Sequence, residues 1–99
     1  MRRAARVDRN QAEIVKALRQ VGATVTPTHT VGGGFPDIVV GYQGATYALE
    51  IKDGTKLPSA QKLTEDEQRW HDTWRGQKDV VRDIPEALEA IGALRGAVS

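Results

Sequence analysis

The sequence has no cysteine, and only 5 % of its 99 residues are aromatic. Without cysteine, the chain has no disulfide framework, no thiolate metal site and no cysteine nucleophile. It also lacks an apolar run near the ~18 residues that cross a membrane, and its basic start, MRRAARVDR, has no apolar segment of a secretory signal. We therefore expect no membrane anchor, and the absence of cysteine fits the reducing cytoplasm.

The composition is that of a small globular domain. Apolar residues make up 39 % of the chain and charged residues 27 %, so the sequence is too apolar for a disordered segment. A chain of 99 residues has room for one core, in which about two-thirds of the unfolded surface becomes buried. We expect a single domain over residues 1–99.

Positive charge is concentrated toward the N-terminus, although the net charge is only +1. Residues 1–36 hold six Lys or Arg against two Asp or Glu, and the rest of the chain is acidic. A basic arm over residues 1–9 suits phosphate binding, with a solvated N-terminal segment as the alternative. The overall balance is too weak to indicate nucleic acid by charge alone.

Hydrophobic spacing, turn residues and helix caps predict an α/β fold with the element order α-β-β-β-α-β-α. Before the second strand, Gly32-Gly33-Gly34 forms either a loop that approaches a ligand closely or a flexible connector. The expected elements are a helix over 10–21 with Asp8 considered as its N-cap, a strand over 23–30, a hairpin within 36–54, a helix over 64–75, a strand over 78–82 and a last helix opened by Asp83.

The hairpin, PDIVVGYQGATYALEIKDG, contains the candidate site. Gln43-Gly44 is typical of a two-residue turn, and the register that follows places Asp37 opposite Glu50. Side chains alternate along a strand, so Lys52 shares the face of these two carboxylates. The other face forms the hydrophobic core and holds Ile38, Val40, Tyr47, Leu49 and Ile51.

Two carboxylates opposite each other repel, because directly opposed Cβ atoms lie about 5 Å apart. A divalent cation bound between Asp37 and Glu50 would offset this repulsion, and the ammonium of Lys52 adds positive charge nearby. The alternative is a solvated polar face of an ordinary hairpin. The combination of Pro-Asp, a Glu in matched register and Glu-x-Lys favours the metal site.

The helix after the hairpin begins with a capping box, Thr64-Glu65-Asp66-Glu67. Trp70 and Trp74 are four residues apart and are predicted to form the buried stripe of this helix rather than a base-stacking surface. We expect His71 on the exposed face of the same helix and His29 in a loop near the site, and assign catalysis to neither.

These motifs resemble the PD-(D/E)XK nuclease superfamily, and within it the stand-alone VRR-NUC (virus-type replication-repair nuclease) domain. The resemblance covers about residues 10 to 94. One departure is the loop over 53–63, which is longer than expected and holds a second glutamine, Gln61. The features that carry the resemblance are Pro36-Asp37 followed after twelve residues by Glu50-Ile51-Lys52, the glycines before Phe35, Glu13 on the first helix, Asp53-Gly54, and Gln68 within LTEDEQRWHDTWRG.

The resemblance implies a restriction-endonuclease-like αβββαβ core, a central mixed sheet flanked by helices, with a C-terminal helix added. It implies Mg²⁺ or Mn²⁺ bound by Asp37, Glu50 and the backbone carbonyl of Ile51, oxygen ligands that suit these ions. Lys52 would hold the attacking water and stabilise the transition state, with Glu13 and Gln68 as further catalytic residues. The sequence leaves open whether burial or the two carboxylates determine the direction of the Lys52 pKa shift.

The resemblance also implies a homodimeric DNA endonuclease acting on branched or Holliday-junction-like DNA, in phage replication or DNA repair within a bacterial host. Two alternatives remain: a non-catalytic nucleic-acid-binding module on a nuclease fold, and a generic α/β domain in which the motif is fortuitous. Metal-dependent cleavage of DNA by the intact chain separates the endonuclease hypothesis from these two alternatives.

Overall fold

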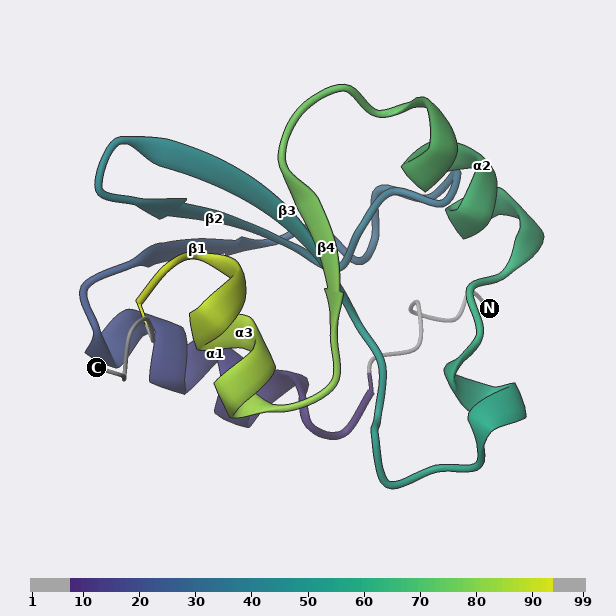
Figure 1. Ribbon diagram of the computed structural model, residues 1–99, viewed down its shortest axis with the longest axis horizontal. Helices are drawn as coiled ribbons and strands as arrows, with labels where there is room; N and C mark the ends of the chain where they lie inside the picture. Colours follow the sequence, from purple (N-terminus) through teal and green to yellow (C-terminus); the bar gives the residue numbers. More distant parts are fainter. Residues whose placement is uncertain (1–7, 94–99) are drawn as a thin grey trace.

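The computed structural model describes residues 8–93, which form a four-stranded mixed sheet with helices (Figure 1). Residues 1–7, most of the expected basic arm, lie outside the described part. None of the helices within residues 8–93 has the length and apolarity needed to cross a bilayer. The elements are α1 (Gln11–Gln20), β1 (Thr24–Pro27), β2 (Ile38–Tyr42), β3 (Ala45–Ile51), the 3₁₀ helix η1 (Pro58–Gln61), α2 (Glu65–Thr73), β4 (Lys78–Val81) and α3 (Ile84–Ala90).

The sheet has the strand order β1-β2-β3-β4, with antiparallel pairing of β1, β2 and β3 and parallel pairing of β3 with β4. In the β2–β3 hairpin, Val40 pairs with Tyr47 and Tyr42 with Ala45, which confirms the predicted register. Gln43 and Gly44 both have positive φ, 49° and 83°, as the two-residue turn requires. The predicted α/β fold, including its αβββαβ order and final helix, is confirmed.

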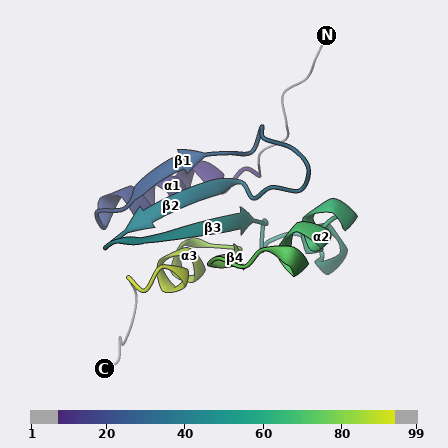
Figure 2. The same cartoon turned by 90° about the horizontal axis from the view of Figure 1, so that it is seen from above.

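The hydrophobic core lies between one face of the sheet and helices α1 and α3, which lie on the same side of the strands (Figure 1). Ile38, Val40, Leu49 and Ile51 are at most 2 % exposed, so the core face of the hairpin is the predicted one. From α1, Ile14 and Leu18 reach this core at the helical spacing seen in the sequence. The view from above shows how the sheet stacks on α1 and α3 while α2 lies at one end (Figure 2).

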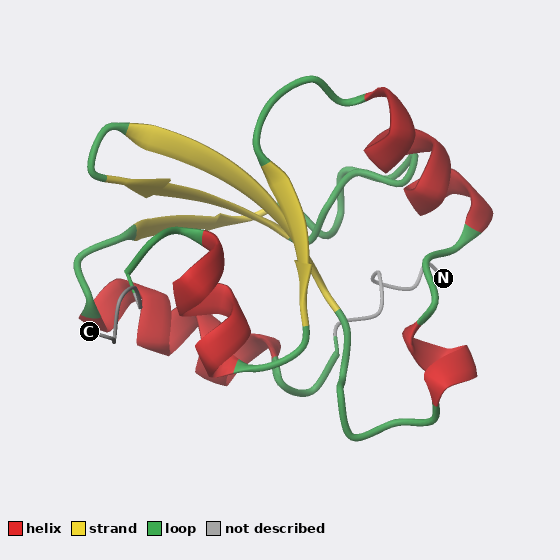
Figure 3. Cartoon of the chain, viewed as in Figure 1, coloured by secondary structure: helices red, strands yellow, loops and turns green. Residues whose placement is uncertain are grey.

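Helix α2 and η1 stand beyond the ends of the strands instead of covering the sheet (Figure 3). The prediction that Trp70 and Trp74 form a buried stripe is therefore wrong. Trp74 is 41 % exposed, and the two indoles stack on each other with centroids 4.6 Å apart, outside the main core. The exposed position expected for His71 is also wrong, since this side chain is 7 % exposed.

The boundaries of two elements differ from the predictions. Helix α1 has Asn10 as its N-cap, while the carbonyl of Asp8 accepts a hydrogen bond from the amide of Gln11, so Asp8 precedes the helix. Strand β1 ends at Pro27 rather than Thr30; beyond it the amide of Thr28 still donates to the carbonyl of Asp37, and the chain then turns, with the amide of Val31 donating to the carbonyl of Thr28. Pro27 lies on an edge strand, as predicted.

Candidate active site

Asp37, Glu50 and Lys52 come together at one end of the β2–β3 hairpin. With Asp8, Ile51, Thr64 and Glu67 they line a cavity of about 300 Å³. The amide of Ile51 donates to Oδ2 of Asp37 over 2.8 Å, and the amide of Asp37 donates to the carbonyl of Leu49 over 3.1 Å. The regular pairing of β2 with β3 ends at Ile38 and Leu49, and these two bonds hold Asp37 beside Glu50 just beyond it.

The glycine-rich segment before β2 is tied to the end of β1. The amide of Thr28 donates to the carbonyl of Asp37 over 2.7 Å, and its hydroxyl donates to the carbonyl of Pro36 over 2.8 Å. Asp37 is thus held through its carbonyl, its amide and its side chain. This fixation holds the Asp37 carboxylate in the cavity, within hydrogen-bonding reach of Glu50.

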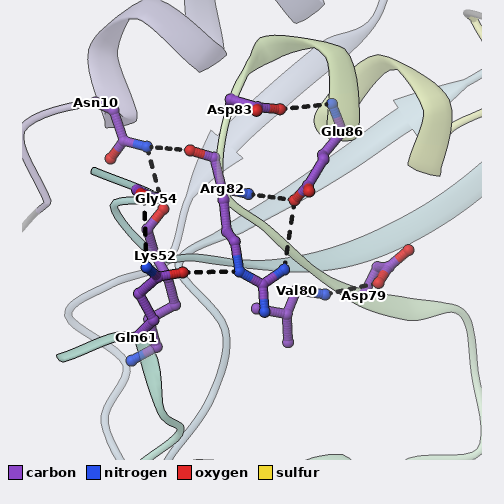
Figure 4. A network of polar contacts seen from close by, with 9 residues as sticks. All are labelled: Asn10, Lys52, Gly54, Gln61, Asp79, Val80, Arg82, Asp83 and Glu86. Atoms are coloured by element: carbon purple, nitrogen blue, oxygen red, sulfur yellow. Dashed lines mark hydrogen bonds and ion pairs between the residues drawn. The ribbon is translucent and has the colours of Figure 1, made fainter. Parts of the chain in front are cut away.

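The backbone of Lys52 is fixed from two other elements. Its amide donates to the carbonyl of Val81 in β4 over 3.0 Å, and its carbonyl accepts from Nδ2 of Asn10 over 3.1 Å. The same Nδ2 donates to the carbonyl of Arg82 over 2.9 Å, and the Arg82 side chain is held by Gln61 and Glu86 (Figure 4). Asn10, the N-cap of α1, therefore links the residue that follows β3 to the residue that follows β4.

Glu67 is a site residue that the sequence did not reveal. Its Oε1 lies 2.9 Å from Nζ of Lys52, closer than Oε2 of Glu50, which lies 3.8 Å away. The same Oε1 accepts from the amide of Thr64, so the predicted capping box is confirmed and also orients the lysine. A capping box is common at helix starts, and only the position of α2 beside β3 shows this second role.

The two carboxylates strongly affect each other's ionisation. Burial, reinforced by the charge of Asp37, raises the pKa of Glu50 to about 9. Burial also raises the pKa of Asp37, although its hydrogen bond from the Ile51 amide opposes the rise. Glu50 is 3 % exposed, and its Oε1 has no hydrogen-bond partner within residues 8–93. Positive charge entering the cavity would favour ionisation of both carboxylates.

The charges around Lys52 answer the question that the sequence left open. Burial lowers the pKa of Lys52, but the hydrogen bond and charge of Glu67, with the charge of Glu50, outweigh it and raise the pKa above its usual value. The pKa of Glu67 is lowered, because the Thr64 amide and Lys52 outweigh the effect of burial. Lys52 is accordingly a fixed ammonium at neutral pH.

Glu13 and Gln68 lie outside this cavity. Glu13 is exposed on α1, whose buried face is formed by neighbouring positions. Gln68 is exposed on α2, and its amide donates to Oδ1 of Asp72 over 2.8 Å. Asp8 and Glu67 line the cavity instead. The predicted catalytic roles of Glu13 and Gln68 stay predictions without support from this arrangement.

The ligands for an ion are few. Within residues 8–93, no three side chains of His, Cys, Asp or Glu gather closely enough to hold a metal ion together. A site at Asp37 and Glu50 would therefore be completed by backbone and water oxygens, and Ile51 is among the residues that line the cavity. Mg²⁺ in proteins commonly keeps several waters beside one or two carboxylates.

The element order and the mixed sheet have a restriction-endonuclease-like fold, in which Asp37 lies before β2 and the Glu-x-Lys motif at the end of β3. The particular fold is that of a VRR_NUC domain. A solved structure with the description "VRR_NUC domain" superposes with a TM-score of 0.63, covering 84 % of this chain and 90 % of that one at 22 % identity. No protein-family model matches the sequence, nor does any curated protein. The chain thus has a nuclease fold.

Proposed function

We propose that the protein is a metal-dependent endonuclease that hydrolyses phosphodiester bonds in DNA. The observation that carries this proposal is the convergence of Asp37, Glu50 and Lys52 on one cavity at the end of the hairpin. Two adjacent carboxylates beside an ammonium are poorly suited to holding a phosphate by themselves. They suit phosphate chemistry when a divalent cation is bound between acid and phosphate.

The residues present fit Mg²⁺ or Mn²⁺. Oε1 of Glu50 is buried and lacks a hydrogen-bond partner in the described part of the chain, while burial and the charge of Asp37 raise the pKa of Glu50. Both features are satisfied by a cation on the two carboxylates, with the Ile51 carbonyl as a further oxygen ligand. When bound, such an ion lowers the pKa of a coordinated water and neutralises charge on the phosphate.

Lys52 supplies the fixed positive charge. Its backbone is held by Val81 and Asn10, and its ammonium is held by Glu67, so its position is set before substrate arrives. A preorganised ammonium stabilises charge that develops on the phosphoryl oxygens in the transition state. Because its pKa is raised, Lys52 orients the attacking water and donates hydrogen bonds rather than acting as the base.

Branched DNA and a homodimer are part of the proposal. One domain of 99 residues covers only a short piece of DNA backbone, and two copies related by a two-fold axis would cut two strands symmetrically. Light scattering during gel filtration, with and without four-way-junction DNA, measures the assembly. A monomer under both conditions would remove the dimer from the proposal and leave the chemistry untouched.

Cleavage assays with linear, flapped and four-way-junction DNA test the enzyme. We expect cutting in Mg²⁺ or Mn²⁺, none in EDTA, and loss of cutting in Asp37→Asn and Lys52→Ala. Asp79→Asn and Lys56→Ala, at exposed positions, are the matched controls and should cut normally. Circular dichroism establishes that each variant is folded. Binding without cutting by the wild-type chain would favour the non-catalytic module.

A further inference from the structure

A second cavity opens on the face of the sheet that carries the site. It has a volume of about 300 Å³ and is lined in part by Val39, Ala48, Phe35 and Trp74. Val39 pairs with Ala48, and each lies two residues along its strand from Asp37 and Glu50, respectively. Alternate residues of a strand share a face. The part of this aromatic pocket formed by Val39 and Ala48 is therefore two residues, about 7 Å, along the strands from the carboxylate pair.

The wall of the aromatic pocket is a prearranged stack of rings. Trp74 stacks on Trp70 at an interplanar angle of 20°, and Phe35 packs its edge against both, with centroids 5.3 and 6.4 Å away. A Cβ at Gly76 would lie 2.8 Å from Nε1 of Trp74, so a larger residue there would displace the indole. A large aromatic ring, 41 % exposed and outside the core, is thus held in a defined orientation.

Two cationic residues are chain neighbours of residues that line the aromatic pocket. Arg75 and Lys78 are both exposed, and neither forms a salt bridge within the described residues. Nζ of Lys78 lies 3.5 Å from the backbone carbonyl of Trp74, which places the ammonium next to the backbone of this pocket residue. Aromatic surface flanked by cations is typical of single-stranded nucleic-acid binding, in which rings stack on bases and cations contact phosphates.

We propose that the aromatic pocket binds an unpaired nucleobase of the substrate strand, stacked on Trp74, next to the phosphate at Asp37 and Glu50. The inference rests on the proposed nuclease function and specifies its substrate class. A base inside a duplex is already stacked on both sides, so only a base released from pairing can occupy the pocket. The enzyme would therefore select DNA with an unpaired nucleotide at the cut, as in flaps, forks or opened junctions.

Intrinsic fluorescence tests this proposal directly, because the chain contains two tryptophans, Trp70 and Trp74, and both belong to this stack. Titration in Ca²⁺ with a short thymidine oligonucleotide should quench the emission and shift it. An abasic oligonucleotide with the same number of phosphates, and a blunt duplex, should bind without this change. Equal quenching by the thymidine and abasic strands would overturn the proposal.

Variants locate the effect. Trp74→Ala should weaken binding of the thymidine strand by about 5-fold or more in fluorescence anisotropy and leave the abasic strand unchanged. Trp74→Phe should retain most of the affinity. Leu57→Ala is the matched control, since Leu57 is 75 % exposed and lies outside the aromatic pocket. If Trp74→Ala does not fold, Thr46→Leu, which narrows the pocket at an exposed lining residue without changing the charge, should produce the same selective loss.

Failure of this inference can be distinguished from failure of the nuclease proposal. Asp37→Asn should abolish cutting and retain base-dependent quenching, whereas Trp74→Ala should reduce cutting of flapped DNA by raising KM. If Trp74→Ala turns a dimer into a monomer without changing the preference for bases over abasic sites, a second copy covers the surface. That result would overturn the nucleobase assignment and leave the site at Asp37 and Glu50 standing.

Discussion

At the scale of single residues, the cavity contains more acidic side chains than the positive charge of Lys52 can balance. One cavity is lined by the ammonium of Lys52 and by four acidic residues, Asp8, Asp37, Glu50 and Glu67. Glu67 is matched to Lys52 at 2.9 Å, while Glu50 is buried with one oxygen unpaired among residues 8–93. Glu50 therefore destabilises the metal-free fold and is available to a cation.

This imbalance makes a pH-dependent prediction. The pKa of Glu50 is raised to about 9 in the fold, so between its ordinary value and 9 the folded state binds more protons than the unfolded state. The free energy of unfolding of the metal-free protein should therefore fall as pH rises through that range. Glu50→Gln should be more stable than wild type at pH 8, on the order of 1–2 kcal/mol, with little difference at pH 4.

Urea denaturation in EDTA at pH 4, 6 and 8 measures this difference. Glu65→Gln, which removes an exposed carboxylate at the start of α2, is the control and should show no comparable pH trend. A Glu50→Gln protein that is less stable than wild type at pH 8 would contradict the assignment of a strained, buried carboxylate.

Glu67 is a positioning residue in this arrangement. Glu67→Gln keeps the cap of α2, because glutamine also serves in a capping box, but it removes the charge beside Lys52. The pKa of Lys52 should fall, and kcat should drop about 10- to 100-fold with a smaller change in KM. The alkaline limb of the pH–rate profile should move toward neutral pH. An unchanged profile with normal kcat would show that Glu67 acts only as a cap.

At the scale of elements, α2 is positioned by its contact with the glycine segment before β2, and it contributes no residue to the hydrophobic core. A Cβ on Gly34 would overlap the backbone of Asp66, in the first turn of α2. Gly34 also has a positive φ of 84°. The glycine thus permits the close approach that places Glu67 beside Lys52 and Phe35 against Trp70.

Gly34→Ala should therefore displace α2, lower the free energy of unfolding by about 1–3 kcal/mol and reduce cleavage. Gly33→Ala is the matched control, since Gly33 also has a positive φ, 65°, but a Cβ there meets no atom within 4 Å. The two variants share the backbone cost, and the excess in Gly34→Ala reports the contact with α2. Equal losses in urea denaturation would contradict this account.

At the scale of the whole molecule, the two faces of the sheet have different roles. Helices α1 and α3 complete the core on one face of the sheet, so the β2–β3 hairpin can present its other face to a ligand. The acidic cavity and the aromatic pocket both lie on that face. The stability of this small domain should be linked to cation binding, because the ion relieves repulsion only in the folded state.

Mg²⁺ or Mn²⁺ should accordingly raise Tm. At a concentration ten times Kd the gain is about 1.4 kcal/mol, or ~6–11 °C for a domain of this size. Asp37→Asn should abolish the shift, whereas Asp79→Asn, which changes an exposed carboxylate, should retain it. Differential scanning fluorimetry with and without EDTA makes the comparison. A wild-type Tm that stays the same with either ion would count against the metal site.

Local rules in the sequence determined the hairpin and its face. A two-residue turn at Gln43-Gly44 and the period-two alternation of a strand require Asp37 to oppose Glu50, with Ile38 and Leu49 on the core side. The capping box likewise depends on residues only three positions apart, so Thr64 and Glu67 were predictable. These features need no knowledge of what lies across the molecule.

The tertiary structure alone decided where α2 lies. Helical periodicity identified Trp70 and Trp74 as one apolar stripe, but not what covers it, and the approach of α2 to Gly34 leaves Trp74 exposed and His71 buried. The same placement brings Glu67 to Lys52 across fifteen residues of chain and keeps Gln68 outside the cavity. Such contacts depend on how a long connection folds, and no local periodicity encodes that.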